Sequence, residues 1–464
     1  MIPLSLDAIA TVVGGRLCDV PDAGVVVTAP LAVDSREVEP GGLFAALAGE
    51  RADGHEFAEA AVRAGAVAVL AARPVGVPAI VVDDVLTAMA DLARMVLGEA
   101  GGPVVVGLTG SAGKTSTKDL IAQVLPELGP TTATVKSFNG EIGMPIAVTH
   151  LDRGMRYLVL EMGARGVGHI ANLATIAPPS VGLVLNVGTA HVGEFGGRDA
   201  IARAKGELVE ALPADGLAVL NADDPLVAAM ASRTKARVLT FGVSPEADVR
   251  AERVTVDTTG RPSFTLTSAG ASADVTLNLY GEHHVSNALG AAAVAIGLGA
   301  DVGKVAAALS RALLVASGRM EVTDRPDGVR VVNDAFNANP DSMRAALKAL
   351  AAMSGGRRTV AVLGEMKELG GDARDGHTEV GHLVAECGVA VLVAVGGQDA
   401  EALAEAARDR SPGLRLLRAA DRDAALEVLR AELQTGDVVL VKGSHSVGLE
   451  KTAGLLAQPD TSGN

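Results

Sequence analysis

The stretch from Pro103 to Leu120, PVVVGLTGSAGKTSTKDL, constrains the chain more than any other part of the sequence. An apolar, β-branched run (Val104–Val106) leads into a glycine-containing turn, and Gly-Lys-Thr-Ser closes that turn. Apolar residues then recur at helical spacing, so the pattern predicts a strand, a loop and a helix in that order. The backbone N–H groups of such a loop, together with the positive end of the helix dipole, bind phosphate oxygens.

The side chains in this loop indicate ATP and Mg²⁺ as its ligands. Lys114 would reach the β and γ phosphates, and the Thr115 hydroxyl would bind Mg²⁺. Leu108 stands where the common form of the motif has glycine, so the loop is a variant. The residues expected to bind the nucleotide here are Gly110, Ser111, Ala112, Gly113, Lys114, Thr115 and Ser116.

Length and composition set the class of protein. The chain has 464 residues, 48% of them hydrophobic and 20% charged, which predicts about three domains with a sizeable core. A net charge of −15 argues against a nucleic-acid partner. Cys18 and Cys387 lie far apart and fit no metal-site spacing, and the sequence has neither a signal peptide nor a run long enough to span a membrane. We therefore expect a cytoplasmic α/β protein.

The order of predicted elements divides the chain into three regions. Residues 1–100 predict a small α/β domain, 101–315 a mostly parallel sheet with helices on both faces, and 316–464 a Rossmann-like domain. Period-two alternation within 255–279 predicts an antiparallel edge on the central sheet. The expected strands of the central and last regions are 104–106, 157–160, 181–187, 217–221, 238–241, 330–332, 359–363, 389–395 and 438–441.

Three central strands end in residues suited to chemistry. Glu161 follows the second, His191 lies shortly after the third, and an Asn-Ala-Asp-Asp-Pro segment begins at Asn221. Because ligands bind at the carboxyl ends of parallel strands, we expect these residues to converge near the phosphate loop. A single Glu or His at a strand end is more often structural; two of them beside a phosphate loop favour metal binding.

Motifs along nearly the whole chain resemble those of the Mur ligases. They are DSREVEPGGLFAALAGERADGHEF, TGSAGKTS, SFNGEIGMP, LEMGARGVGHI, NVGTAHVGEFG, AKGEL, NADDP, GEHHVSNALGAAA, SGRMEV, NDAFNANPDSM, LGEMKELG and VKGSHSVGLEKT, in the order usual for that family. Within the family they are most similar to members that join D-alanyl-D-alanine to UDP-N-acetylmuramoyl-tripeptide during synthesis of peptidoglycan precursors.

The resemblance implies an ATP-dependent amide ligase. ATP would phosphorylate a carboxylate of the nucleotide-linked peptide, and an amine would then attack the acyl phosphate. Lys114 would hold phosphate, while Thr115, Glu161 and His191 would hold Mg²⁺. Lys205 matches the lysine that is carbamylated in the family, since a lysine kept neutral by burial can add CO₂; the alternative is an ordinary surface lysine.

Further residues are assigned through the same resemblance. Asn287 would contact adenine, or it would be only a polar residue at a helix N-terminus. Arg319 and Asp334 would reach the γ-phosphate and the ribose, which requires the third domain to close on the second. The nucleotide sugar and its peptide would lie against Ser35, Arg36, His55 and Asn139, and the incoming amine against Asn337, Asn339 and His377. A solvated loop with Asp53 as a helix N-cap is the alternative for the first of these segments. The resemblance also implies small-molecule substrates and a monomer.

Five positions depart from the usual residues of the family: Gly140, His284, Phe336, His445 and Leu449. They keep open a sister ligase that accepts a different amine. A phosphate-loop ATPase that drives motion or transport is a second alternative. It leaves the DSR and DGH residues of the first region without a role. A non-catalytic nucleotide-sugar-binding protein is the third, although Lys114, Glu161 and Lys205 are all present.

Overall fold

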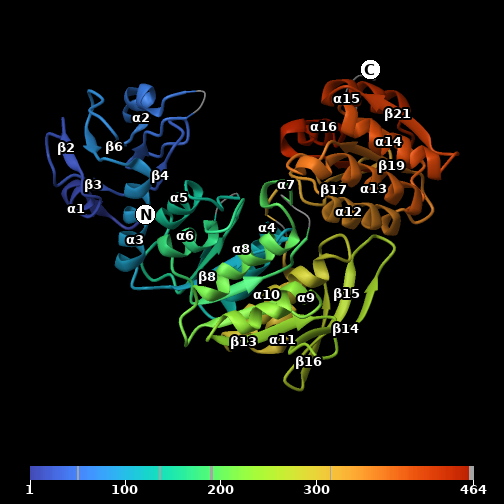
Figure 1. Ribbon diagram of the computed structural model, residues 1–464, viewed down its shortest axis with the longest axis horizontal. Helices are drawn as coiled ribbons and strands as arrows, with labels where there is room; N and C mark the ends of the chain where they lie inside the picture. Colours follow the sequence, from blue (N-terminus) through green and yellow to red (C-terminus); the bar gives the residue numbers. More distant parts are fainter. Residues whose placement is uncertain (50–51, 135–136, 189–191, 314, 459–464) are drawn as a thin grey trace.

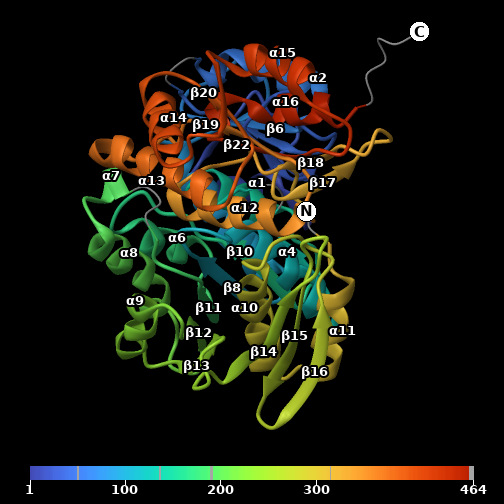
Figure 2. The same cartoon turned by 90° about the vertical axis from the view of Figure 1, so that its right-hand side faces the viewer.

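Three α/β domains follow one another along the chain, and the first and third lie on the same side of the second (Figures 1 and 2). The computed structural model describes residues 1–49, 52–134, 137–188, 192–313 and 315–458. The predicted α/β class, with a parallel central sheet and a Rossmann-like last domain, is confirmed. In the described part of the chain no helix combines the length and apolarity needed to cross a bilayer.

The first domain is built on a five-stranded sheet of order β2-β7-β6-β5-β4 and a small β1-β3 pair. Its strands are β1 (Leu4–Ser5), β2 (Arg16–Cys18), β3 (Val26–Val27), β4 (Leu31–Ala32), β5 (Leu43–Ala45), β6 (Ala68–Ala71) and β7 (Ala79–Val81). Its helices are α1 (Leu6–Val12), η1 (Gly54–Phe57), α2 (Ala58–Ala64) and α3 (Val85–Glu99). The Asp53 carboxylate accepts a hydrogen bond from the His55 N–H at 3.0 Å, so Asp53 does cap this turn.

The central domain contains a nine-stranded sheet of order β16-β15-β14-β13-β12-β11-β8-β10-β9. Its strands are β8 (Val104–Thr109), β9 (Thr131–Ala133), β10 (Tyr157–Glu161), β11 (Val181–Val184), β12 (Leu217–Asn221), β13 (Arg237–Gly242), β14 (Val249–Val256), β15 (Pro262–Ser268) and β16 (Ala271–Thr276). The last three form the predicted antiparallel edge, and the other neighbours are parallel.

Helices cover both faces of this sheet because alternate strand residues point to opposite sides. Val106 and Leu108 pack with α4 (Lys114–Val124), α10 (His284–Gly297) and α11 (Val302–Arg311). On the other face, a second core contains Val105 and residues of α5 (Gly143–Thr149), α6 (His169–Ile176) and α8 (Arg198–Glu210). That core continues into the first domain, so these two domains share one apolar interior. The shorter helical elements of this domain are η2 (Leu125–Glu127), α7 (Val192–Phe195), α9 (Pro225–Ala228) and η3 (Ala229–Arg233).

The C-terminal domain has a six-stranded sheet of order β17-β18-β22-β19-β20-β21, with cores of its own on each face. Its strands are β17 (Glu321–Asp324), β18 (Arg330–Asn333), β19 (Thr359–Gly364), β20 (Val391–Val395), β21 (Arg415–Ala419) and β22 (Val438–Lys442). Its helices are α12 (Pro340–Met353), η4 (Gly370–Asp372), α13 (Ala373–Glu386), α14 (Gln398–Arg410), α15 (Arg422–Glu432), η5 (His445–Val447) and α16 (Leu449–Leu456).

The strand β11 is shorter than the sequence predicts. The sequence predicts a strand over 181–187, whereas β11 ends at Val184. Beyond it the chain turns toward the phosphate loop, where the Asn186 carbonyl accepts a hydrogen bond from the Ser111 N–H at 3.2 Å. A local contact with the loop therefore replaces the regular ladder.

Candidate active site

The phosphate loop has the predicted strand–loop–helix geometry. β8 ends at Thr109, and α4 begins at Lys114. Gly113 has a φ of +81°, which favours glycine, and a Cβ on it would overlap the Asn287 side-chain oxygen. Asn287 is buried near the start of α10, and its side-chain oxygen lies beside Gly113 of the loop.

Asn186 fixes the loop, although sequence reasoning did not single this residue out. Its Oδ1 accepts hydrogen bonds from the N–H groups of Ser111 and Ala112, both at 2.9 Å. Its Nδ2 donates to the Ala112 carbonyl at 3.1 Å. The signal that could have found it is its position just after the strand that pairs with β8.

Charged side chains from three elements gather around the loop. Lys114 Nζ donates to the Gly110 carbonyl at 2.7 Å. Desolvation lowers the pKa of Lys114, and the Glu161 carboxylate opposes that change. Glu161 ends β10 and is 1% exposed; its Oε2 accepts from Asn139 Nδ2 at 3.4 Å, while its Oε1 has no hydrogen-bond partner among the described residues. A buried, half-satisfied carboxylate fits the role of a metal ligand.

Lys205 lies in the middle of α8 and is buried, so the alternative of an ordinary surface lysine is wrong. Desolvation, followed by the neighbouring positive charge of Lys114, lowers the pKa of Lys205 well below that of a free lysine. No hydrogen bond or ion pair of Lys205 occurs within the described residues. A neutral, buried amine is the form that can add CO₂.

Arg319 brings the C-terminal domain into this cluster. Its Nη2 donates to Ser137 Oγ at 3.4 Å, and that oxygen lies 3.3 Å from Thr115 Oγ1. Burial lowers the pKa of Arg319, and the negative charge of Glu161 is the largest opposing influence. The guanidinium also stacks over the Phe336 ring, 4.3 Å from its centroid. The predicted meeting of the second and third domains at Arg319 is therefore present.

His283 and His284, at the start of α10, lie between Asn287 and the C-terminal domain. His284 is next to Asn287, and His283 is near Asp334 and Lys442. Asn287 Nδ2 lies 3.3 Å from His284 Nδ1, and the rings of His283 and His284 are 4.2 Å apart. Burial lowers the pKa of both histidines, that of His283 to about 4. His283 Nδ1 and His284 Nε2 have no hydrogen-bond partner in the described ranges.

Several predicted residues in the C-terminal domain already have partners there. Asp334 Oδ2 accepts from the buried Lys442 Nζ at 2.6 Å, and its Oδ1 accepts from the Met320 N–H. Asn337 Oδ1 accepts from the next N–H along the chain. Asn339 caps α12 through the Ser342 N–H at 2.9 Å.

His377 is the residue for which the structure favours a different role from the predicted one. It is fully buried, its Nε2 accepts from the Met366 N–H at 2.9 Å, and its Nδ1 donates to the Ala373 carbonyl at 2.7 Å. With both nitrogens bonded inside its own domain, the ring holds the loop after β19 and offers no group to an incoming amine.

Of the predicted first-domain residues, Ser35 and Arg36 follow β4, and His55 lies in η1. Arg36 pairs with Asp34 and its side chain is 86% exposed. His55 is buried, with Nδ1 donating to Asp53 at 2.6 Å and Nε2 accepting from the Ala72 N–H. Ser35 is half-buried beside Arg36. An exposed guanidinium held by a carboxylate can still present its other N–H groups to a diphosphate.

His191, a predicted metal ligand, lies outside the described residues. Within the described ranges, no group of three His, Cys, Asp or Glu side chains could by itself hold a metal ion. Thr115 and Glu161 offer a hydroxyl and a carboxylate oxygen at the phosphate loop. This mixed oxygen set is the kind that Mg²⁺ prefers.

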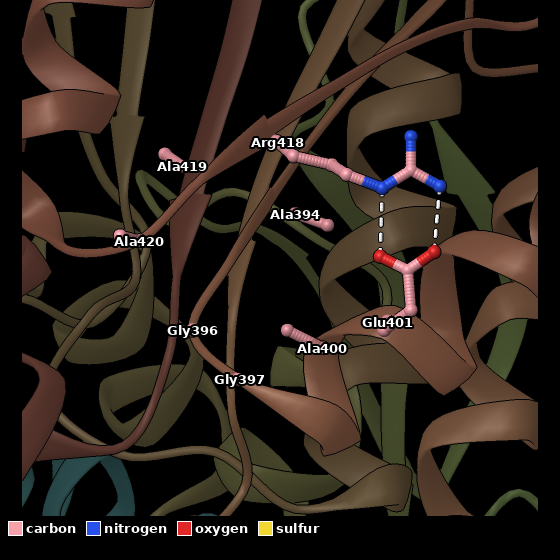
Figure 3. A pocket seen from close by; sticks show the side chains of 8 residues that line it. All are labelled: Ala394, Gly396, Gly397, Ala400, Glu401, Arg418, Ala419 and Ala420. Carbon is pink, nitrogen blue, oxygen red and sulfur yellow. Dashed lines mark hydrogen bonds and ion pairs between the residues drawn. The ribbon is translucent and has the colours of Figure 1, made fainter.

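A separate hollow lies at the ends of β20 and β21 in the C-terminal domain (Figure 3). Its two charged side chains, Glu401 and Arg418, are joined by two hydrogen bonds of 2.7 and 2.6 Å. Alanines and glycines form the rest of its lining.

Comparison with known proteins decides the family. The Mur ligase family catalytic domain matches residues 30–96, the Mur ligase middle domain 108–295, and the Mur ligase glutamate ligase domain 318–445. The chain belongs to the Mur ligase family. It is 49% identical to the UDP-N-acetylmuramoyl-tripeptide–D-alanyl-D-alanine ligase of Mycobacterium tuberculosis, with 100% of this chain and 99% of that relative covered.

Solved structures of this Mur ligase branch share the whole architecture. MurF from Acinetobacter baumannii is 30% identical, with a TM-score of 0.86 over 98% of this chain and 99% of that one. MurF ligase from Thermotoga maritima, solved in complex with ADP, is 29% identical, with a TM-score of 0.78 over 93% of this chain and 97% of that one. These similarities confirm the predicted resemblance and the three-domain fold.

Proposed function

We propose that this Mur ligase joins D-alanyl-D-alanine to UDP-N-acetylmuramoyl-tripeptide at the expense of ATP, in the synthesis of peptidoglycan precursors. The names of its full-length relatives support the substrates. The observation that carries the chemistry is the cluster of Lys114, Glu161, Lys205 and Arg319 at the phosphate loop, because it joins phosphate-binding cations to a buried carboxylate.

The residues have separate tasks in the proposed reaction. Lys114 and the loop amides bind the β and γ phosphates of ATP, while Arg319 binds the transferred phosphoryl group. Thr115 and Glu161 would hold Mg²⁺, with His191 and a carbamate on Lys205 completing that set. The bound cation would neutralise charge on the phosphates.

Bond making and breaking then follow in two steps. A carboxylate oxygen of the peptide attacks the γ-phosphorus, giving an acyl phosphate and ADP. The amine nitrogen of the dipeptide attacks the acyl carbon, inorganic phosphate leaves, and the amine proton passes to phosphate or solvent. Positioning supplies most of the acceleration, because phosphoryl transfer needs little covalent assistance from the protein.

The three domains divide the substrates. Residues 1–100 would bind the nucleotide sugar through Ser35, Arg36 and His55. Residues 101–315 would bind ATP, with Asn287 against adenine and Asn139 beside the peptide. Residues 316–464 would bind the amine near Asn337 and Asn339, with Asp334 close to the ribose. Because the acyl phosphate hydrolyses in water, closure of this third domain would protect it.

The test is product formation from Mg-ATP, UDP-N-acetylmuramoyl-tripeptide and D-alanyl-D-alanine, followed by mass spectrometry. The expected product is the tripeptide substrate with its mass raised by one dipeptide less one water. No amide product from these substrates would refute the proposal.

A sister specificity is the second candidate, and a specific contact favours testing it. Phe336 packs between Arg319 and His445, with the two rings 5.7 Å apart. Together with His284 and Leu449, these departures from the usual family residues lie in or beside segments that meet the amine or the nucleotide. Single amino acids and other dipeptides in the same assay would reveal a different acceptor.

A further inference from the structure

Two glycines on the segment between β11 and α8 lie close against the C-terminal domain. Gly188 lies four residues after β11, and Gly193 lies in α7. Each one faces a residue of the C-terminal domain at a distance that leaves no room for a side chain. The mechanism described above does not use either glycine.

Gly188 links the phosphate loop to α12. Its N–H donates to Ser111 Oγ at 2.9 Å, and Ser111 is a loop residue. A Cβ on Gly188 would overlap Asp341 Oδ2 and would lie 3.3 Å from the Ser111 Cβ. Asp341 is in the first turn of α12, and its carboxylate occupies the space that a side chain at position 188 would need.

Gly193 meets the loop after β19. A Cβ on Gly193 would lie 2.6 Å from both the Cα and the N of Gly370. Backbone atoms cannot rotate away as a side chain can, so this contact is rigid. The loop that carries Gly370 is itself fixed, because the Met366 N–H donates to His377 and the Lys367 N–H donates to Ser444 Oγ at 2.9 Å.

We infer that Gly188 and Gly193 are positioning residues that set how closely the C-terminal domain docks on the phosphate loop, with Asp341 and Gly370 as their contacts. Arg319 enters the site from that same domain, so a shift in docking moves the guanidinium away from the phosphoryl group. A displacement of about 1 Å in such a group can cost up to about a hundredfold in rate. The inference rests on the proposed function, since it assigns docking a role in that reaction.

The sharpest test is a double-mutant cycle across the Gly188–Asp341 contact. Gly188→Ala should lower kcat about tenfold or more and change the KM for ATP less than kcat, because its Cβ overlaps the Asp341 carboxylate but lies 3.3 Å from the Ser111 Cβ of the phosphate loop. Asp341→Ala in the same chain removes the overlapping carboxylate, so the double variant should recover most of the lost kcat. An effect confined to the folding of the central domain would show no such recovery.

Gly193→Ala tests the second contact. Alanine favours a helix over glycine, so the substitution should not weaken α7 itself. The matched control is Gly98→Ala in α3, where a Cβ would meet nothing within 4 Å. Gly193→Ala should lower kcat severalfold and Gly98→Ala should not. Small-angle X-ray scattering in the presence of Mg-ADP should also give a larger radius of gyration for Gly193→Ala than for the wild type.

The outcomes separate this inference from the proposed function. Wild-type kcat in Gly188→Ala and Gly193→Ala, or a Gly188→Ala defect that persists undiminished beside Asp341→Ala, would overturn the docking role while ligation by the wild-type enzyme stands. Absence of ligation by the wild-type enzyme would instead refute the function itself. In that case an unchanged radius of gyration in Gly193→Ala would overturn the docking role as well.

Discussion

The Asp119 carboxylate accepts a hydrogen bond from the Ala316 N–H, with 3.1 Å between Oδ2 and N. Asp119 lies on α4, the helix that begins at the phosphate loop, whereas Ala316 lies in the connection to the C-terminal domain. Gln123, one turn further along α4, is bonded to both backbone groups of Leu313 at 2.7 and 3.0 Å. These hydrogen bonds connect α4, which begins at the phosphate loop, to the segment that leads into the C-terminal domain.

Loss of the hydrogen bond between Asp119 and Ala316 should lower both the stability of the protein and its turnover. Asp119→Ala removes a buried acceptor and the partner of Lys118, 3.0 Å away, so we expect a loss of about 2–4 kcal/mol in unfolding free energy. Denaturant unfolding measures this change. Asp215→Ala is the control, because Asp215 is exposed; an equal loss in both variants would contradict a role for this hydrogen bond.

Lys114→Ala should abolish ligation and leave the protein folded. The lysine is the main cation of the phosphate loop, and its removal leaves the β and γ phosphates without their principal side-chain donor. We expect a fall in kcat of at least about a thousandfold with an unchanged circular dichroism spectrum. Appreciable residual ligation would count against the assigned ATP site.

Gly113→Ala should impair nucleotide binding. Alanine at a φ of +81° is strained, and its methyl group would strike the Asn287 side chain that closes over the loop. The dissociation constant for ADP, measured by calorimetry, should rise about tenfold or more. Gly140→Ala is a matched control, since a Cβ there would meet nothing within 4 Å; equal affinities in the two variants would be the contrary result.

His283 gives the protein a defined acid sensitivity. Burial holds the pKa of His283 near 4, below its ordinary value of 6.5, despite Asp334, which favours the charged ring. Lys442 and His284 are the other titratable groups close by. The unfolded chain therefore binds an extra proton between these two values, so stability is full above about pH 6.5 and falls by up to about 3 kcal/mol as the pH drops toward 4.

Substitution isolates that contribution. His283→Gln should reduce the pH dependence of unfolding free energy between pH 4 and 6.5, and the part due to His284, whose pKa is also lowered by burial, should remain. His445→Gln, at a side chain that is 72% exposed, should leave the dependence as it is in the wild type. Identical pH profiles for His283→Gln and the wild type would show that the ring does not stay neutral.

The buried Lys205 leads us to expect that the enzyme's activity depends on dissolved CO₂. Because its pKa is depressed, the amine of Lys205 loses its proton at a lower pH than an ordinary lysine does, and the neutral form can add CO₂. Activity should fall when bicarbonate and CO₂ are removed at pH 7 and should return when bicarbonate is added. Activity that is indifferent to CO₂ would argue for an unmodified lysine.

The parts of the fold that follow from local pattern could be predicted from sequence. The apolar run before Gly110 and the spacing after Lys114 specify β8 and α4, and β-branched runs specify most central strands. Short elements such as β4 and β21 are not predicted, because runs of two to five residues carry little periodic signal. These strands form because they pair with neighbouring strands of the sheet.

The residues of the site also fall into those that the sequence predicts and those that only the structure reveals. A motif signals Lys114 and Thr115, whereas Asn186 opens the NVGTAHVGEFG motif but shows its role only in the contact between the end of β11 and the loop. His377 shows the reverse, since its sequence position favoured a ligand and its two internal hydrogen bonds give it a structural role. The docking contacts of Gly188 and Gly193 depend on a second domain and could not be read from either segment alone.

The most direct measurement is phosphate release from Mg-ATP by the purified protein, with and without each of the other two substrates. Release that needs both UDP-N-acetylmuramoyl-tripeptide and D-alanyl-D-alanine, in equal amount to the amide formed, is the predicted result. Release that needs neither substrate would contradict the account and indicate a bare ATPase.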